Sequence, residues 1–216
     1  MGDEQRHRFQ VVSSVELYRG RVVALRADEV LMPGGTVARR EVVEHYGAVA
    51  VVALDDAAET PETGPRVMLI HQYRHPLGRR LWELPAGLLD VPGEPPAATA
   101  ARELAEEAGL AARQWDVLVD VAASPGFTDE VVRVFLARGL SAIGREVPDG
   151  DEETDLVARW FDFAEAVRMV LAGEIVNAAT VAGILAAEAV RSGVAAVTRS
   201  ADAPWPDRPS RFAAGM

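Results

Sequence analysis

The chain has 216 residues, of which 49% are hydrophobic and 25% charged, and this composition excludes a disordered chain and fits a globular protein with a real core. The net charge of −11 argues against general binding to nucleic-acid phosphates. All 22 basic residues are arginine and there is no cysteine, which excludes lysine chemistry, disulfides and thiolate metal ligands. No apolar run is long enough to span a membrane and no secretory signal is recognisable, so we expect a cytoplasmic protein without a membrane partner.

The N-terminal part is expected to be extended. Residues 9–17, 21–32 and 37–45 have the composition of strands, and Pro33-Gly34-Gly35 forms the second turn of a small antiparallel meander. The apolar run at residues 47–54 predicts a strand buried on both faces at the centre of the main sheet. A surface loop at 55–65 and a strand at 67–73 follow.

The remainder alternates between helices and strands. A helix is expected at 97–108, because the segment is rich in Ala, Leu and Glu and Gly109 supplies a C-cap. Strands at 116–123 and 131–137 flank a turn-forming segment at 124–130, and an acidic loop at 143–155 precedes a strand at 156–161. The last predicted elements are two helices, at 163–172 and 178–191, followed by an aperiodic tail.

The helix at 97–108 should carry three carboxylates on one face. Glu103, Glu106 and Glu107 are spaced i, i+3 and i+4, so their side chains fall within a sector of about 100°. A hard divalent cation such as Mg²⁺, which binds carboxylate and carbonyl oxygens, would offset their repulsion. The alternative is a solvated acidic face, on which Arg102 and Glu106 form a surface ion pair of little value.

Residues 84–110 resemble the Nudix box, G-x5-E-x7-R-E-U-x-E-E-x-G-U, where U is a bulky aliphatic residue. Every position from Glu94 to Leu110 matches, whereas Gly87 lies seven residues before Glu94 and the pattern asks for six. The resemblance implies an α/β fold of the α+β type, a mixed sheet between helices, and hydrolysis of a diphosphate joined to a second group. It implies Mg²⁺ or Mn²⁺ ligands at Glu103, Glu107, Glu106 and the carbonyl of Ala86, with Glu94 as a further carboxylate.

Outside the box, the chain is similar to the ADP-ribose pyrophosphatase branch of that family. The similarity lies in Arg39 to His45, Gln72-Tyr73-Arg74, Leu81 to Gly87, Ser124-Pro125-Gly126 and Gly173-Glu174-Ile175. It implies that Arg74 contacts phosphate, that Arg40 lies near the adenine, and that Glu130 helps to hold the substrate. It also implies a homodimer formed through the meander at 1–45, a catalytic domain at 46–199 and a tail at 200–216.

The general base is expected in the acidic loop after the box. Comparison with the family favours Glu153 and then Glu152 among the carboxylates of that loop, which also include Asp149, Asp151 and Asp155. The implied reaction converts ADP-ribose to AMP and ribose 5-phosphate.

Several alternatives remain open from the sequence. Arg74 could extend to solvent, and Arg39 could serve in place of Arg40. The substrate could be a related nucleoside diphosphate sugar. The chain could also be a non-catalytic ADP-ribose sensor, which the intact glutamates disfavour, or a structural dimer module.

Overall fold

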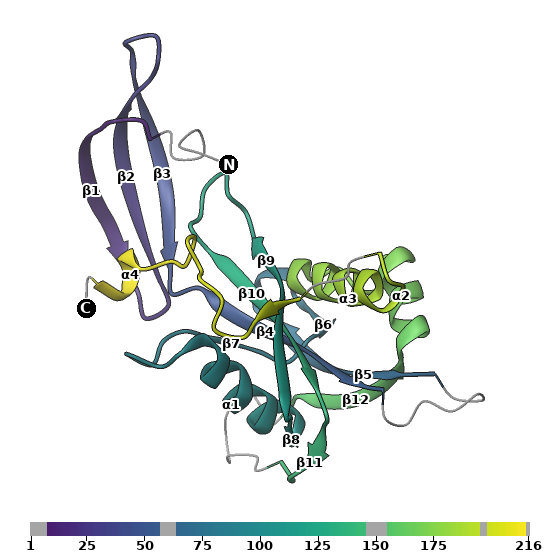
Figure 1. The fold of residues 1–216 in the computed structure, drawn as a ribbon. Coiled ribbons are helices and arrows are strands. Elements are labelled where there is room, and N and C mark those ends of the chain that lie inside the picture. Colours follow the sequence, from purple (N-terminus) through teal and green to yellow (C-terminus); the bar gives the residue numbers. More distant parts are fainter. Residues whose placement is uncertain (1–7, 57–63, 146–154, 195–197, 215–216) are drawn as a thin grey trace. The chain divides into compact units, whose positions relative to one another are not determined.

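The computed structural model describes residues 8–56, 64–145, 155–194 and 198–214, and the chain divides into two compact units. The first unit combines Met1–Gly47, Ser124–Glu130 and Arg208–Met216, and the second combines Ala48–Ala123 with Val131–Asp207 (Figure 1). The expected domain boundaries after residues 45 and 199 stay a prediction. Each compact unit combines segments that are separated in the sequence.

The first unit contains the expected antiparallel meander. Its strands are β1 (Val11–Arg19), β2 (Val23–Leu31) and β3 (Val37–His45), in the order β1-β2-β3. The segment at 124–130 lies along β3, because the Val43 amide donates to the Phe127 carbonyl at 2.7 Å. This distant segment therefore extends the meander.

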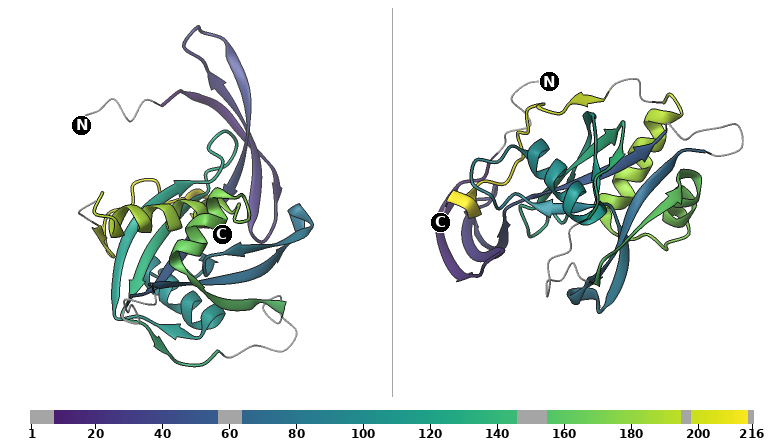
Figure 2. Two further views of the ribbon diagram at one scale, coloured as in Figure 1. Left: turned by 90° about the vertical axis from the view of Figure 1, so that its right-hand side faces the viewer. Right: turned by 90° about the horizontal axis from the view of Figure 1, so that it is seen from below.

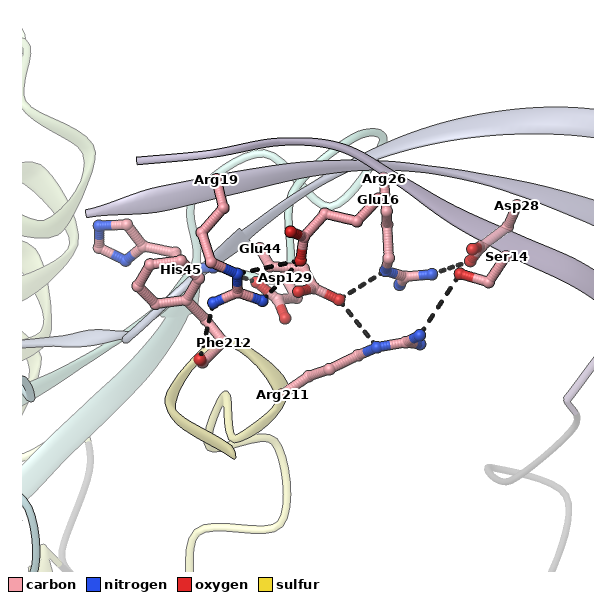
Figure 3. A network of polar contacts seen from close by, with 10 residues as sticks. All are labelled: Ser14, Glu16, Arg19, Arg26, Asp28, Glu44, His45, Asp129, Arg211 and Phe212. Atoms are coloured by element: carbon pink, nitrogen blue, oxygen red, sulfur yellow. Dashed lines mark hydrogen bonds and ion pairs between the residues drawn. The ribbon is translucent and has the colours of Figure 1, made fainter. Parts of the chain in front are cut away.

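The C-terminal helix α4 (Arg211–Ala214) also belongs to the first unit. Phe212 is buried there in a small hydrophobic cluster. Glu44 is also buried, and two arginines form ion pairs with its carboxylate. The Nε atoms of Arg26 and Arg211 lie 2.7 and 2.9 Å from Glu44 Oε1 (Figure 3). Because a buried carboxylate needs such partners, these ion pairs fix the chain end to the meander.

The second unit is built on an eight-stranded mixed sheet in the order β12-β5-β4-β10-β9-β13, with β6 paired to β5 and β7 paired to β4. The β4 and β10 pair is parallel and the other pairs are antiparallel, which confirms the predicted mixed sheet. The strand bounds are β4 (Ala48–Asp55), β5 (Arg66–Arg74), β6 (Arg79–Glu83), β7 (Ala86–Leu88), β9 (Gln114–Ala122), β10 (Val131–Arg138), β12 (Val157–Asp162) and β13 (Arg199–Ser200).

Helices cover both faces of this sheet, as Figures 1 and 2 show. They are α1 (Pro96–Ala108), α2 (Phe163–Leu171) and α3 (Ala178–Arg191). Along β4, Ala50 and Val52 belong to the core cluster shared with α2 and α3, whereas Val49 and Val51 belong to the cluster shared with α1. Since successive side chains of a strand point to opposite faces, β4 is buried on both, as its apolar run predicts.

The elements absent from the sequence prediction are all short. They are β6, β7, the 3₁₀ turn η2 (His75–Leu77), β8 (Leu110–Ala111), β11 (Ser141–Ala142), β13 and α4. Elements of two to five residues are too short for a recognisable hydrophobic period. Within the described ranges, no helix is both long and apolar enough to cross a membrane.

Candidate functional site

The helix α1 occupies the predicted position. Proline is favoured in its first turn because an amide there lacks an intrahelical acceptor in any case, and alanine then favours propagation. Gly109 ends the helix with φ of 63°, and its amide donates to the Ala105 carbonyl at 3.0 Å. Leu104 is fully buried in the core between α1 and β4, and so fixes the rotation of the helix.

Two of the three glutamates on α1 are buried. The residue exposure is 9% for Glu103 and 4% for Glu107, whereas the side chain of Glu106 is 46% exposed. Charged side chains are rarely buried unless they are paired or bind a cation. A solvated acidic face therefore describes Glu106 and not the other two.

Arg102 joins the carboxylates of this region. Its Nη1 donates to Glu103 at 2.7 Å and to Glu106 at 2.9 Å, while its Nε and Nη2 lie 3.4 and 3.3 Å from the Glu94 oxygens. Burial alone would lower the pKa of Arg102, but these carboxylates outweigh it and raise that pKa above its ordinary value. Arg102 is thus part of a network rather than of one surface ion pair.

Glu94 reaches this network despite the extra residue before it. Gly93 adopts φ of 79°, and the Glu94 amide donates to the Val91 carbonyl at 3.2 Å, so a turn accommodates the longer loop. Hydrogen bonds from Arg102 and then from Thr99, whose Oγ1 is 2.8 Å away, hold the pKa of Glu94 below its usual value. Glu94 is therefore an ionised neighbour of the helix.

The strand β7 brings the loop backbone to the buried glutamates. The Ala86 amide donates to Glu107 Oε2 at 2.8 Å. At Gly87 an added Cβ atom would overlap the carboxyl group of Glu103, so only glycine allows this approach. The Ala86 carbonyl stays a predicted metal ligand.

The helix α3 supports the same loop from the other side. Thr180 is buried, and its Oγ1 accepts a hydrogen bond from the Leu84 amide at 3.0 Å. A Cβ atom at Gly183 would lie 2.8 Å from Leu84 Cδ1, which shows how closely the helix approaches. Sequence reasoning missed this support. Asn177 as an N-cap residue marks the start of α3 but not its contact with Leu84.

A cleft of about 520 Å³ lies beside Arg74. The Nε and Nη2 of Arg74 donate to the two carboxylate oxygens of Glu83 at 2.9 and 2.8 Å, and Glu83 is 1% exposed. Arg74 is therefore held at the cleft wall rather than simply extended to solvent. Sequence reasoning missed Glu83, because a strand as short as β6 has no recognisable period that would show its charged side chain to be buried. The lining residues are Gln72, Tyr73, Arg74, His75, Pro76, Asp155 and Leu156.

The other two predicted substrate residues belong to the first unit. Arg40 lies on β3 and is exposed, and its Nη1 donates to the Arg39 carbonyl at 2.9 Å. Glu130 Oε1 lies 3.8 Å from His45 Nδ1. Their joint contact with substrate and Arg74 stays a prediction.

The predicted general bases Glu153 and Glu152 lie outside the described residues, as do Asp149 and Asp151. Asp155 is described, forms an ion pair with Arg80, and lines the cleft. Asp155, the last residue of the predicted acidic loop, therefore lies at the cleft.

No group of three or more His, Asp or Glu side chains in the described ranges has the arrangement of a metal site. The three predicted ligands have partners within the protein: Arg102 donates to Glu103 and Glu106, and the Ala86 amide donates to Glu107. The ligand assignment thus stays a prediction.

Comparisons with known proteins identify a family for this chain. A model of the NUDIX domain matches residues 44–182. An ADP-ribose pyrophosphatase of Mycobacterium tuberculosis is 55% identical over 209 residues, which cover 96% of both chains. A methanol dehydrogenase activator of Bacillus methanolicus is 38% identical and covers 81% of this chain and 90% of its own. A solved structure described as an ADP compounds hydrolase has a TM-score of 0.71 at 18% identity, covering 88% of this chain and 98% of its own, and supports the fold.

Proposed function

The chain belongs to the Nudix family and is a Nudix hydrolase, and we propose that it cuts the diphosphate of ADP-ribose into AMP and ribose 5-phosphate. The observation that carries the chemistry is the pair of buried carboxylates, Glu103 and Glu107, on one face of the box helix. The choice of substrate is supported by the 55% identity to an ADP-ribose pyrophosphatase over nearly the whole length of both chains.

The oxygen donors on α1 suit a hard divalent cation, for which we expect Mg²⁺ or Mn²⁺. Glu103, Glu106 and Glu107, with the Ala86 carbonyl, would hold it, and Gly87 leaves the space that the Glu103 carboxylate needs. When bound, such a cation neutralises charge on the diphosphate and lowers the pKa of water. Arg102 balances Glu103 and Glu106 when no cation is held.

Arg74 is proposed to bind phosphate at the cleft. The bidentate contact with Glu83 fixes the plane of its guanidinium, which reduces the entropy lost when an anion binds. The cleft volume of about 520 Å³ is of the size that small ligands occupy. Arg40 is proposed to lie near the adenine, and Glu130 to help hold the substrate.

The proposed reaction is an attack of water on one phosphorus. A loop carboxylate, Glu153 in the first place and Glu152 in the second, accepts the proton of that water. The anhydride P–O bond breaks, and its electron pair leaves with the departing phosphate, so that AMP and ribose 5-phosphate separate.

Two alternatives define the tests. The alternative substrate is another nucleoside diphosphate sugar. The shape of the pocket decides between such a ligand and ADP-ribose. A non-catalytic ADP-ribose sensor is the alternative function, and one relative is named as an activator of another enzyme. The intact glutamates at positions 103, 106 and 107 disfavour it.

The meander is proposed to form a homodimer. Strand β1 is an edge strand, all of its residues but the last are exposed, and Val12, Val15 and Leu17 are among them. An exposed apolar edge strand can pair with a strand of another chain.

Sedimentation velocity should show a dimer at micromolar concentration, because the exposed edge of β1 pairs with a second copy of the chain. A monomer at every concentration would contradict the proposed dimer.

Substrate choice is tested with a panel of ADP-ribose, NADH, diadenosine compounds and nucleotide sugars, with Mg²⁺ or Mn²⁺ and with products identified. We expect the highest kcat/KM with ADP-ribose, and AMP and ribose 5-phosphate as its products. Faster hydrolysis of a nucleotide sugar would favour the alternative substrate. Binding of ADP-ribose without hydrolysis would favour the sensor.

Glu103→Gln and Glu107→Gln should each lower kcat at least about 100-fold, because a neutral amide is a poor ligand for a hard cation. Circular dichroism should show that both variants fold. Glu188→Gln, a partly exposed glutamate on α3, is the matched control and should keep its activity. Unaltered rates in Glu103→Gln or Glu107→Gln would remove that residue as a ligand.

Glu153→Gln should lower kcat by about 10²- to 10⁴-fold while Mn²⁺ affinity stays the same, because a general base acts on the proton and not on the cation. Steady-state kinetics and Mn²⁺ titration measure the two effects. Glu152→Gln is the matched comparison. If Glu153→Gln is harmless and Glu152→Gln is not, the role moves to Glu152.

A further inference from the structure

Negative charge accumulates at the C-terminal end of α1. Glu106 and Glu107 lie in its last turn, where unpaired carbonyls already give the helix dipole its negative end. The last turn contains no basic residue of its own. A cation from elsewhere in the chain is therefore expected to stabilise this end.

The segment that follows β11 is docked along this helix end. Strand β11 pairs with β8, and the Ile143 amide then donates to the Gly109 carbonyl at 2.9 Å. A Cβ atom at Gly109 would lie 2.9 Å from the Arg145 amide nitrogen, so the absence of a side chain permits the approach. These contacts place Arg145 beside the last turn of α1.

The guanidinium of Arg145 joins two distant backbone carbonyls. Its Nε donates to the Glu106 carbonyl at 3.1 Å, and its Nη1 donates to the Leu156 carbonyl at 3.0 Å. Leu156 is buried and lines the cleft that also contains Arg74. One side chain thus links the helix of the predicted metal ligands to the wall of the predicted phosphate site.

We propose that Arg145 is a positioning residue, which fixes the glutamate-bearing end of α1 relative to the cleft wall at Leu156. This inference rests on the proposed hydrolysis, because its consequence is the distance between the cation on α1 and the diphosphate at Arg74. Catalysis depends on such distances, and a displacement of about 1 Å can cost about 100-fold in rate. The planar guanidinium suits the role because it can donate in two directions at once, whereas a lysine ammonium is a single point charge.

The test compares Arg145→Gln and Arg145→Lys with the wild type. We expect Arg145→Gln to lower kcat for ADP-ribose at least about tenfold, with a change in KM below about threefold. Arg145→Lys should recover part of the loss, because it keeps a cation at the helix end. Arg113→Gln is the matched control, since Arg113 lies between β8 and β9 against Gly139, and it should have wild-type kcat.

Amide hydrogen exchange, measured without substrate, supplies a second measurement. The Ile143 amide should exchange faster in Arg145→Gln than in the wild type or in Arg113→Gln. Unchanged exchange at Ile143 would show that Arg145 does not hold its segment against the end of α1, and would overturn the proposal. Faster exchange with unchanged kcat would make Arg145 purely structural and overturn its positioning role. If the wild type does not hydrolyse ADP-ribose, the proposed function fails, and exchange at Ile143 still decides whether Arg145 holds its segment against the end of α1.

Discussion

The burial of Glu103 and Glu107 beside a third carboxylate on α1 is the constraint on which the functional half of the molecule depends. A buried charge without a partner costs several kcal/mol, so each carboxylate requires a compensating group. Arg102 supplies a guanidinium, and the Ala86 amide supplies a hydrogen bond to Glu107. The same concentration of negative charge is the reason that a divalent cation is proposed to bind at this helix.

The sheet makes this arrangement possible because it holds two helices close to one loop. The helix α1 packs on one face of β4 and α3 on the other, and the segment at 84–86, from the end of β6 to the start of β7, contacts both. Gly87 and Gly183 stand where a side chain would collide with Glu103 or Leu84. Glycine at these positions therefore leaves the space that the close packing around the candidate site requires.

Local patterns in the sequence were sufficient to predict α1, its glutamate face and the strand at the centre of the sheet. The helix period places Glu103 and Glu107 together, and the continuous apolar run identifies β4 as buried on both faces. The contacts of Arg145, Thr180 and Glu83 could not be predicted in this way. They join residues far apart in the chain, or bury a charge in a strand as short as β6, and single-sequence periodicity carries no information about either. For the same reason, the association of residues 124–130 and 208–214 with the meander could not be predicted.

Direct binding of a divalent ion tests the central claim. The purified protein is titrated with Mn²⁺ in the presence of a non-hydrolysable ADP-ribose analogue, and electron paramagnetic resonance reports the free ion. Saturable uptake that requires the α1 carboxylates is the predicted result. An absence of uptake at any Mn²⁺ concentration that leaves the protein folded would contradict the account.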